Sequence, residues 1–307
     1  MTGPTPEIIC QSAGPLSEVS WLDRGATLHA LRLGGQPFTV TLPSLDAYTR
    51  PHPYVGTAIG RVANRIRGGQ FEIDGWTYQV ATNENGNTPH GGPDGFERQD
   101  WTLEAHGNSG IEMRHRSPDG HQGWPGNLDV TIRSEVSEGS VEITYLATTD
   151  APTPVSLTHH TYFALPDTER ADNHTLRVFG DTYTAVGEDL LPTEYGVPVA
   201  GTEYDFRDAR QIGDTSIDLS FDIPGEGLRP QVELSDGTTK LTVLSTLPAV
   251  QVYTGEALFE AGLPARSGIA IEPQFPPDLV NTSRAEEIIL RPGQTYHHVI
   301  QYKVEHL

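Results

Sequence analysis

The chain has 307 residues, and its 20 lysines and arginines against 41 aspartates and glutamates give a net charge of −21. Charge of this sign repels nucleic-acid phosphates and anionic membrane surfaces, so we expect neither as a partner. The single cysteine, Cys10, excludes an internal disulfide, and no Cys/His pattern typical of zinc is present, so no metal site is expected.

The sequence also carries no targeting signal of a familiar kind. Its N-terminus has neither a basic segment nor an apolar one, and no run approaches the ~18 apolar residues of a membrane span. We therefore expect a soluble cytoplasmic protein. The 32 glycines and 24 prolines are scattered and mark no linker, so we expect one domain over residues 1–307. The sequence leaves open whether the protein is a monomer or a homodimer.

Short apolar or alternating runs, bounded by Gly, Pro, Asn or Asp, recur along the chain and predict strands. The clearest pair is a hairpin over residues 71–80, because Asp74-Gly75 between alternating runs favours a type I′ turn. A second hairpin is expected from 128–136 and 141–148 on either side of 137–140. The remaining expected strands cover residues 38–42, 241–244, 250–253, 269–271 and 296–304.

Helical periodicity is nearly absent. No segment of ten or more residues repeats its apolar positions every 3.6 residues, and residues 283–290 offer at most a turn or two. Many short strands with frequent turns predict an all-β sandwich or barrel-like fold of mainly antiparallel sheets. A large twisted sheet has a concave face, where polar side chains of neighbouring strands can converge on a ligand.

Polar residues that a hairpin does not need flank the first one. Asn64 and Arg65 precede it and His90 follows it. A strand pair that brings an arginine and a histidine together would make a binding site. A solvated arginine and a loop histidine are the simpler alternative on these residues alone.

Two adjacent histidines, His159 and His160, form a second polar feature. Neighbouring side chains on a strand point to opposite faces, so one histidine can face a site while the other faces the core or solvent. This spacing is poor for chelating a single metal ion. A packed or surface histidine pair is the alternative.

Two carboxylates follow apolar runs. Asp218 stands between apolar neighbours and either faces a ligand or is an ordinary solvated side chain. Glu272 ends the run 269–271, and Pro273 after it is expected to stop the strand. Burial there would raise the pKa of Glu272 and suit it to be a general base, whereas a strand-end glutamate in water would be unperturbed.

The order of these features resembles the aldose 1-epimerase (galactose mutarotase) family. The resemblance runs from about Tyr48 to the C-terminus. It is carried by Gly60-Arg61-Val62-Ala63-Asn64-Arg65-Ile66, His90-Gly91-Gly92, Gly95-Phe96, Trp101, residues 157–165, Leu191-Pro192-Thr193, Asp205-Phe206-Arg207, Gln251-Val252-Tyr253-Thr254-Gly255, Glu272-Pro273-Gln274, Pro277-Asp278 and Asn281.

The resemblance implies a β-supersandwich and the interconversion of α and β anomers of a free monosaccharide such as glucose or galactose, without a cofactor. Carried over by position, it makes Glu272 the general base and His160 the general acid. The residues that it implies as sugar contacts are Asn64, Arg65, His90, Asp218 and Gln251, with Asp205 and Asp222 as rivals of Asp218.

Four residues depart from the family pattern and leave the sugar contacts, and so the preferred aldose, open: His159, Ala164, Leu219 and Glu256. A non-catalytic sugar-binding protein and an epimerase of phosphorylated hexoses are alternatives. The first needs no acid–base pair, and the second needs a cationic phosphate clamp. A glycosidase is disfavoured, because that chemistry usually needs two carboxylates and the acid implied here is a histidine. The sequence shows no Gly-x-Ser-x-Gly elbow, phosphate loop or dinucleotide fingerprint.

Overall fold

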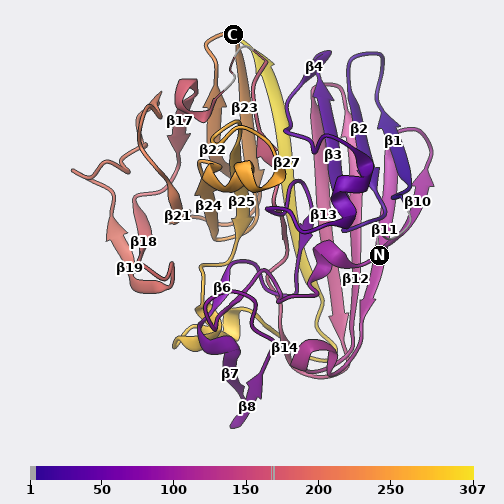
Figure 1. Ribbon diagram of the computed structural model, residues 1–307, viewed down its shortest axis with the longest axis vertical. Helices are drawn as coiled ribbons and strands as arrows, with labels where there is room; N and C mark the ends of the chain where they lie inside the picture. The colour runs from indigo at the N-terminus through magenta and orange to yellow at the C-terminus, as the bar shows by residue number, and fades with distance from the viewer. Residues whose placement is uncertain (1–4, 167, 169) are drawn as a thin grey trace.

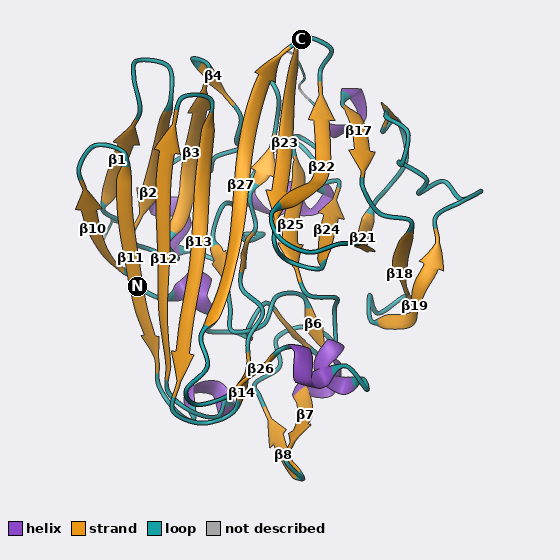
Figure 2. Ribbon diagram, turned by 180° about the vertical axis from the view of Figure 1, so that it is seen from behind, coloured by secondary structure: helices purple, strands orange, loops and turns teal. Residues whose placement is uncertain are grey.

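Two layers of antiparallel sheet face each other in the computed structural model, which describes residues 5–166, 168 and 170–307 (Figure 1). One layer is a single large sheet, seen nearest the viewer in Figure 2. Its strands, in spatial order, are β10 (Thr102–His106), β11 (Gly110–Ser117), β12 (Leu128–Ser137), β13 (Ser140–Thr149), β27 (Tyr296–His306), β23 (Thr239–Ser245), β22 (Arg229–Ser235), β17 (Thr175–Val178) and β20 (Arg210–Gln211).

The opposite layer consists of two smaller sheets that lie side by side against the large one (Figure 1). The first has the order β1 (Ile8–Ser12), β2 (Glu18–Leu22), β3 (Thr27–Leu33) and β4 (Gln36–Pro37). The second has the order β16 (Tyr162–Phe163), β25 (Ile269–Gln274), β24 (Ala249–Tyr253), β21 (Asp218–Asp222), β18 (Thr182–Val186) and β19 (Pro192–Pro198).

The remaining strands form short two-stranded ladders. They pair β5 (Ala58–Ile59) with β15 (Thr158–His159), β6 (Arg65–Ile66) with β9 (Thr88–Pro89), β7 (Gln70–Ile73) with β8 (Trp76–Gln79), and β14 (Thr153–Pro154) with β26 (Ile289–Leu290). Helical segments in the described part of the chain are short 3-10 turns: η1 (Leu45–Thr49), η2 (Arg67–Gly69), η3 (Phe96–Arg98), η4 (His121–Gly123), η5 (Ala171–Asn173), η6 (Glu256–Ala261), η7 (Leu279–Asn281) and η8 (Ala285–Glu287). The predicted all-β fold is therefore confirmed.

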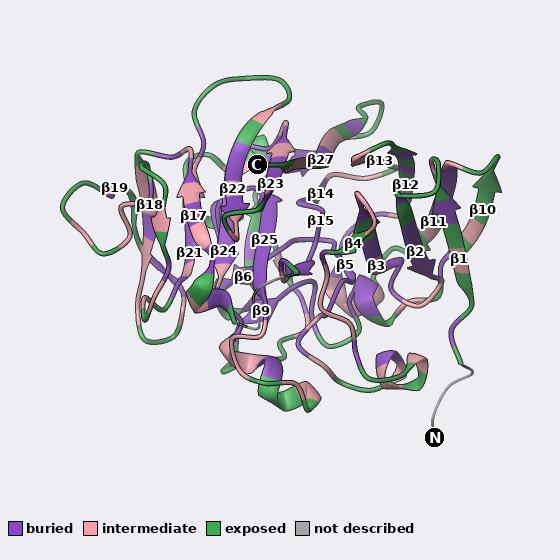
Figure 3. Cartoon of the chain, turned by 90° about the horizontal axis from the view of Figure 1, so that it is seen from above, coloured by how far each residue is buried: buried purple, intermediate pink, exposed green. Residues whose placement is uncertain are grey.

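Strict alternation along the long strands builds the core between the layers. In β12, Leu128, Val130 and Ile132 are buried, while Asp129 and Arg133 are exposed. In Figure 3, β23, β24 and β25 are mostly buried, while long stretches of the connecting loops are exposed. An apolar side chain buried in this way contributes roughly 1.5–3 kcal/mol relative to leaving it in water.

Both predicted hairpins are confirmed. Asp74 and Gly75, with φ of 53° and 80°, connect β7 to β8, and the two positive values are those that a type I′ turn requires. The β12–β13 hairpin is tighter than expected, because Ser137 pairs directly with Ser140. Its two-residue loop contains Gly139 at a φ of 73°.

Replacing Gly139 with Ala is expected to lower the free energy of unfolding by about 1 kcal/mol, because an L side chain at positive φ is strained. Space is not the cause, since the nearest atom to an added Cβ would be 3.5 Å away. Gly139→Asn should retain most of the stability, since asparagine tolerates this conformation. Urea unfolding midpoints check both, and equal losses in the two variants would contradict the explanation.

The strand expected at residues 38–42 is wrong. Thr39 alone forms a bridge there, to Phe163. The neighbouring amides bond to different sheets, Phe38 to Leu31 of β3 and Val40 to Tyr162 of β16. The segment therefore crosses from one sheet to the other, and neither ladder can extend along it.

Arg61 is a fully buried charge that holds several loops together through its hydrogen bonds. Its three guanidinium nitrogens donate to the Ser117 and Thr153 hydroxyls and to the carbonyls of Ser117, Pro118, Pro125 and Gly126. Burial lowers the pKa of Arg61 to about 10, so it remains charged at neutral pH.

Candidate active site

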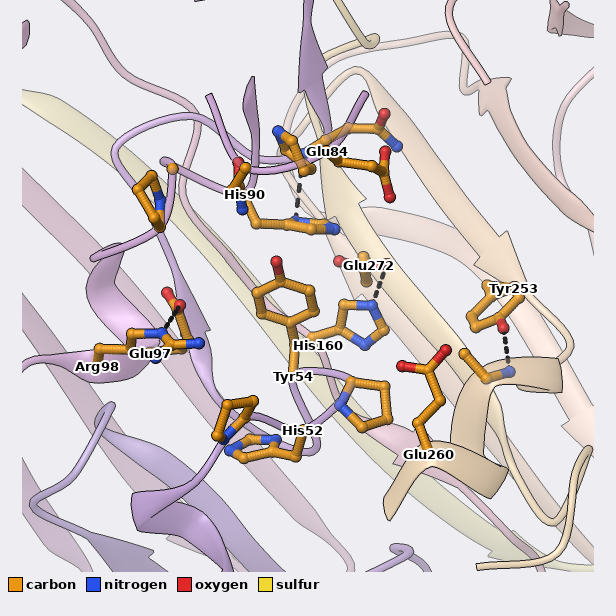
Figure 4. Close-up of a pocket in the computed structure, with 18 of the residues that line it drawn as sticks. His52, Tyr54, Glu84, His90, Glu97, Arg98, His160, Tyr253, Glu260 and Glu272 are labelled. Carbon is orange, nitrogen blue, oxygen red and sulfur yellow. Dashed lines mark hydrogen bonds and ion pairs between the residues drawn. The ribbon is translucent and has the colours of Figure 1, made fainter. Parts of the chain in front are cut away.

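A cavity of about 860 Å³ opens on the concave face of the sheet that contains β21, β24 and β25. Loops 48–54, 83–98 and helix η6 form its rim. The seven residues assigned a role at the sequence level all line it: Asn64, Arg65, His90, His160, Asp218, Gln251 and Glu272. Figure 4 shows three of the side chains that line this cavity, His90, His160 and Glu272, converging near its centre.

Strand pairing determines where the carboxylates of Asp218 and Glu272 and the side-chain amide of Gln251 lie in the pocket. Gln251 of β24 lies opposite Glu272 of β25, so their side chains share one face. Asp218 of β21 lies diagonally across from Gln251, whose Nε2 donates to Asp218 Oδ1 at 2.6 Å. Three adjacent strands thus bring together residues from positions 218, 251 and 272 of the chain.

Pro273 does not end its strand, which corrects the sequence-based expectation. β25 continues through Pro273 to Gln274, and Pro273 pairs with Val250. The Ile271 amide donates to the Thr161 carbonyl, next to β16. The backbone nitrogen of Pro273, two residues further along, faces the same side of β25, but β16 does not extend that far. Proline loses no ladder bond there, because it stands at a locally free edge. Glu272 is therefore in the strand interior and 1 % exposed.

The β6–β9 ladder brings Asn64 and Arg65 beside His90. Arg65 pairs with Pro89, and the His90 amide donates to the Asn64 carbonyl at 3.0 Å. The backbone amide of Asn64 in turn donates to His90 Nδ1 at 3.4 Å. An imidazole that accepts at Nδ1 carries its proton on Nε2 when neutral, and burial lowers the pKa of His90 well below its usual value. His90 is therefore a neutral donor in the pocket.

Arg65 is one of the arginines that line the pocket, and it is itself held by Glu84. Its Nε and a terminal nitrogen donate to the two Glu84 carboxylate oxygens at 2.5 and 3.2 Å. A bidentate pair fixes the plane of the guanidinium, so its remaining donors keep one direction. Glu84 was not singled out in the sequence, where nothing distinguishes it from a loop glutamate.

The two adjacent histidines face opposite ways, as the strand geometry predicts. His160 lines the pocket, whereas His159 is fully buried in the core. His159 shares a hydrogen bond of 2.5 Å with the Tyr145 hydroxyl, and its Nε2 lies 2.9 Å from the Ala26 carbonyl oxygen. Only one histidine of the pair can therefore reach a ligand in this cavity.

His160 and Glu272 form a buried pair. His160 Nε2 lies 3.5 Å from Glu272 Oε1, with 6 % and 2 % of the two side chains exposed. Burial raises the pKa of Glu272 well above its usual value, reinforced by the charge of Asp218. Burial also lowers the pKa of His160 to about 3. Both groups are pushed toward their neutral forms, which makes the carboxylate a stronger base and the imidazolium a stronger acid.

Asp218 occupies the pocket in preference to its two rivals. Asp205 lies outside the cavity and binds Arg207 through both oxygens, at 2.9 and 2.7 Å. Asp222 accepts from the Thr182 hydroxyl at 2.8 Å, also away from the cavity. Burial raises the pKa of Asp218, which favours its use as a hydrogen-bonding group rather than as an exposed charge.

None of the four departures from the family pattern lines the cavity. Leu219 faces the apolar core, and Ala164 donates its amide to the Phe38 carbonyl. Glu256 accepts hydrogen bonds from Thr254, Ser216 and Arg266, and so secures the start of η6. These substitutions are structural and do not alter the lining of the pocket.

Glu97 is a further pocket carboxyl that the sequence did not reveal. It is 7 % exposed, and burial raises its pKa to about 7. The folded protein therefore binds this proton more tightly than the unfolded chain, so ionisation costs stability as pH rises from about 4.5 to about 7. In the described part of the chain its Oε2 has no hydrogen-bond partner, which adds to that cost.

Replacing Glu97 with Gln is therefore expected to stabilise the protein relative to wild type at pH 7.5 more than at pH 4.5. The two shifts differ by at most about 3 kcal/mol, from 1.36 kcal/mol per pKa unit. Urea unfolding of both proteins at the two pH values measures this difference. The same stability difference at both values would show that Glu97 does not titrate in this range.

Comparison with known proteins identifies the family. The family model described as aldose 1-epimerase matches residues 8–303. The chain belongs to the aldose 1-epimerase family. Its relatives include the galactose mutarotase of Homo sapiens, 35% identical over 93% of this chain and 89% of that protein. They also include the aldose 1-epimerase of Escherichia coli K12, 32% identical over 93% of this chain and 91% of its own.

Solved structures support the same fold. The galactose 1-epimerase of Lactobacillus acidophilus superposes with a TM-score of 0.87 at 26% identity, covering 99% of both chains. The aldose epimerase homologue of C. elegans gives a TM-score of 0.90 at 23% identity over 98% of this chain and 99% of its own. The predicted β-supersandwich of the aldose 1-epimerases is thus confirmed.

No helix among the described residues is long and apolar enough to cross a membrane. Within the same residues, no group of three or more His, Cys, Asp or Glu side chains is arranged to hold a metal ion.

Proposed function

We propose that this member of the aldose 1-epimerase family interconverts the α and β anomers of a free aldose in the described pocket. The observation that carries the proposal is the buried contact between His160 and Glu272, at 3.5 Å. Opening a cyclic hemiacetal requires loss of the C1 hydroxyl proton and gain of a proton by the ring oxygen. One base and one acid that face the same cavity provide both transfers.

The reactive form of the site has Glu272 as a carboxylate and His160 as an imidazolium, a minor state of the free pocket because burial favours both neutral forms. Glu272 takes the proton of the C1 hydroxyl while His160 gives its proton to the ring oxygen, and the C1–O5 bond breaks. Both groups are then neutral, which is the state that burial favours. The open aldehyde turns about C1–C2 and closes on its other face, and each group regains its original charge.

The remaining pocket residues hold the sugar. Asp218 and the Gln251 amide form a hydrogen-bonded pair suited to neighbouring hydroxyls. Arg65 and the neutral His90 also line the cavity, and their N–H donors can stabilise negative charge on a sugar oxygen. The side-chain oxygen of Asn64 already accepts the Arg65 amide at 2.8 Å, which leaves its side-chain nitrogen for the sugar.

The alternative of a non-catalytic sugar-binding protein explains less of the site. Hydrogen bonding to hydroxyls needs no carboxylate whose pKa is raised by burial beside an imidazole whose pKa is lowered. Burying both groups costs free energy, and that cost is understandable where proton transfer is the purpose.

Polarimetry tests the proposal. Freshly dissolved α-D-glucose and α-D-galactose are followed with and without purified protein, with buffer catalysis subtracted. A faster approach to an unchanged final rotation is expected, and the ratio of rates between the sugars identifies the preferred one. No acceleration with glucose, galactose, xylose or arabinose would overturn the proposal, and calorimetric titration would then test binding alone.

A further inference from the structure

Tyr54 contacts both histidines of the pocket. Its ring centroid lies 4.5 Å from that of His90 and 5.8 Å from that of His160, and its plane is inclined by only 23° to the His160 ring. The two imidazoles are themselves 5.4 Å apart in an edge-to-face contact. The three rings therefore form one packed group, and Figure 4 shows the Tyr54 ring beside both histidines.

The backbone holds Tyr54 in a conformation unusual for a tyrosine. Its φ is 54°, in the left-handed region, where a non-glycine residue is strained. The Tyr54 amide donates to the His52 carbonyl at 2.8 Å, and the Tyr54 carbonyl accepts from the Thr57 amide and hydroxyl at 3.1 and 3.0 Å. Prolines at 51 and 53 restrict the same turn further.

The same segment is bonded directly to the backbone of His160. The Gly56 amide donates to the His160 carbonyl at 2.9 Å, and the His160 amide donates to the Thr57 carbonyl at 3.0 Å. Tyr54 and His160 are thus fixed in position relative to one another through two reciprocal bonds. The ring contact is a consequence of this frame and does not depend on a flexible loop.

His160 lacks the support that usually orients an acid–base histidine. Such an imidazole commonly bonds through its second nitrogen to a carboxylate or carbonyl. In the described part of the chain, the Nδ1 atom of His160 is buried and has no hydrogen-bond partner. The direction of its Nε2 toward Glu272 must therefore be set by packing.

We propose that Tyr54 is the positioning residue of His160, and that its ring holds the imidazole at the angle from which Nε2 reaches the ring oxygen of the sugar. Tyr162, the other tyrosine against His160, has its centroid at 4.8 Å and a plane inclined by 34°. Both tyrosines line the cavity, but Tyr162 packs into a buried apolar cluster on its other side, whereas Tyr54 contacts both pocket histidines, His90 and His160. The proposal rests on the role given to His160 in the proposed function.

The test separates the ring of Tyr54 from its hydroxyl. Tyr54→Leu removes the ring and is expected to lower kcat by about tenfold to a hundredfold, since misplacing a catalytic group by ~1 Å costs up to ~10²-fold. Tyr54→Phe keeps the ring and should restore wild-type kcat. Tyr78→Leu is the matched control, because Tyr78 stacks on Phe71 with a similar geometry, at 5.6 Å and 20°, in the β7–β8 hairpin.

A second readout does not depend on activity. The ¹⁵N resonances of the His160 imidazole, assigned with a His160→Gln variant, are expected to move in Tyr54→Leu and to stay in place in Tyr54→Phe and Tyr78→Leu. Unchanged kcat and unchanged resonances in a folded Tyr54→Leu protein would overturn the inference. Loss of kcat in Tyr54→Phe as well would do the same, because the hydroxyl and not the ring would then be responsible.

These outcomes can be told apart from failure of the proposed function. If wild-type protein does not accelerate anomer interconversion, the function itself fails before any variant is made. If wild type is active and Tyr54→Leu remains equally active, the function stands and only the positioning role is lost.

Discussion

Replacing Glu272 with Gln is expected to lower kcat for anomer interconversion by about 10²–10⁴-fold, the usual contribution of a positioned proton-transfer group. Glutamine preserves the shape of the side chain and its place opposite Gln251, but it cannot accept the proton of the C1 hydroxyl. Because the interaction matters in the transition state, KM should change far less than kcat. Polarimetric initial rates over a range of sugar concentrations give both constants.

Glu112→Gln is the matched control for this variant. Glu112 is also a buried carboxylate, 5 % exposed, but it lies on β11 and is paired with Arg133 at 2.6 Å, away from the cavity. Its replacement should cost stability and leave kcat unchanged. A Glu272→Gln protein that retains wild-type kcat would remove Glu272 from the mechanism, whatever the control shows.

Replacing His160 with Ala is expected to lower kcat by a similar factor, because the ring oxygen then has no acid beside it. The two groups act in one concerted step, so the double variant should be scarcely slower than either single variant. Effects that multiply would contradict this coupling and would indicate that the residues act in separate steps.

His298→Ala serves as the control for loss of an imidazole. His298 is partly buried against Tyr296 and Phe275 on β27, and it lies outside the cavity. Unfolding curves for both variants separate loss of the acid from loss of structure. Wild-type kcat in His160→Ala would transfer the acid role to another group, and His90 would be the first to examine.

Local sequence pattern predicted the parts of the fold that depend on neighbouring residues. The Asp74-Gly75 turn and the alternation of β12 and β13 are of this kind, since turn chemistry and period-two burial act over a few positions. The pattern failed at Phe38–Leu42, where the chain bonds to two sheets in turn. Strands β1 to β3 were also missed, because their burial is decided by the distant strands of the large sheet.

The site could be predicted only where residues stand in a motif. Motif positions placed Glu272 and His160 in the same cavity, although neither the register of β24 against β25 nor the depth of burial can be read from spacing. Glu84 and Tyr54 escaped notice because their partners, Arg65 and His160, are reached through tertiary contacts. The sequence signal of a constrained backbone at Tyr54 was its position after Pro51 and Pro53 and before Gly56.

Arg61 stabilises a loop that lies outside the pocket but bonds to its lining. The loop that it grips, residues 117–126, sends the Gln122 side chain and the Trp124 indole to the Gly91 carbonyl, each at 3.2 Å, directly after His90. Opening that loop would break both hydrogen bonds to the Gly91 carbonyl, which hold the turn that follows His90. The pocket and residues 117–126 therefore form one cooperative unit, and protection of the Gly92 amide against hydrogen exchange is expected to report on the hydrogen bonds of Arg61.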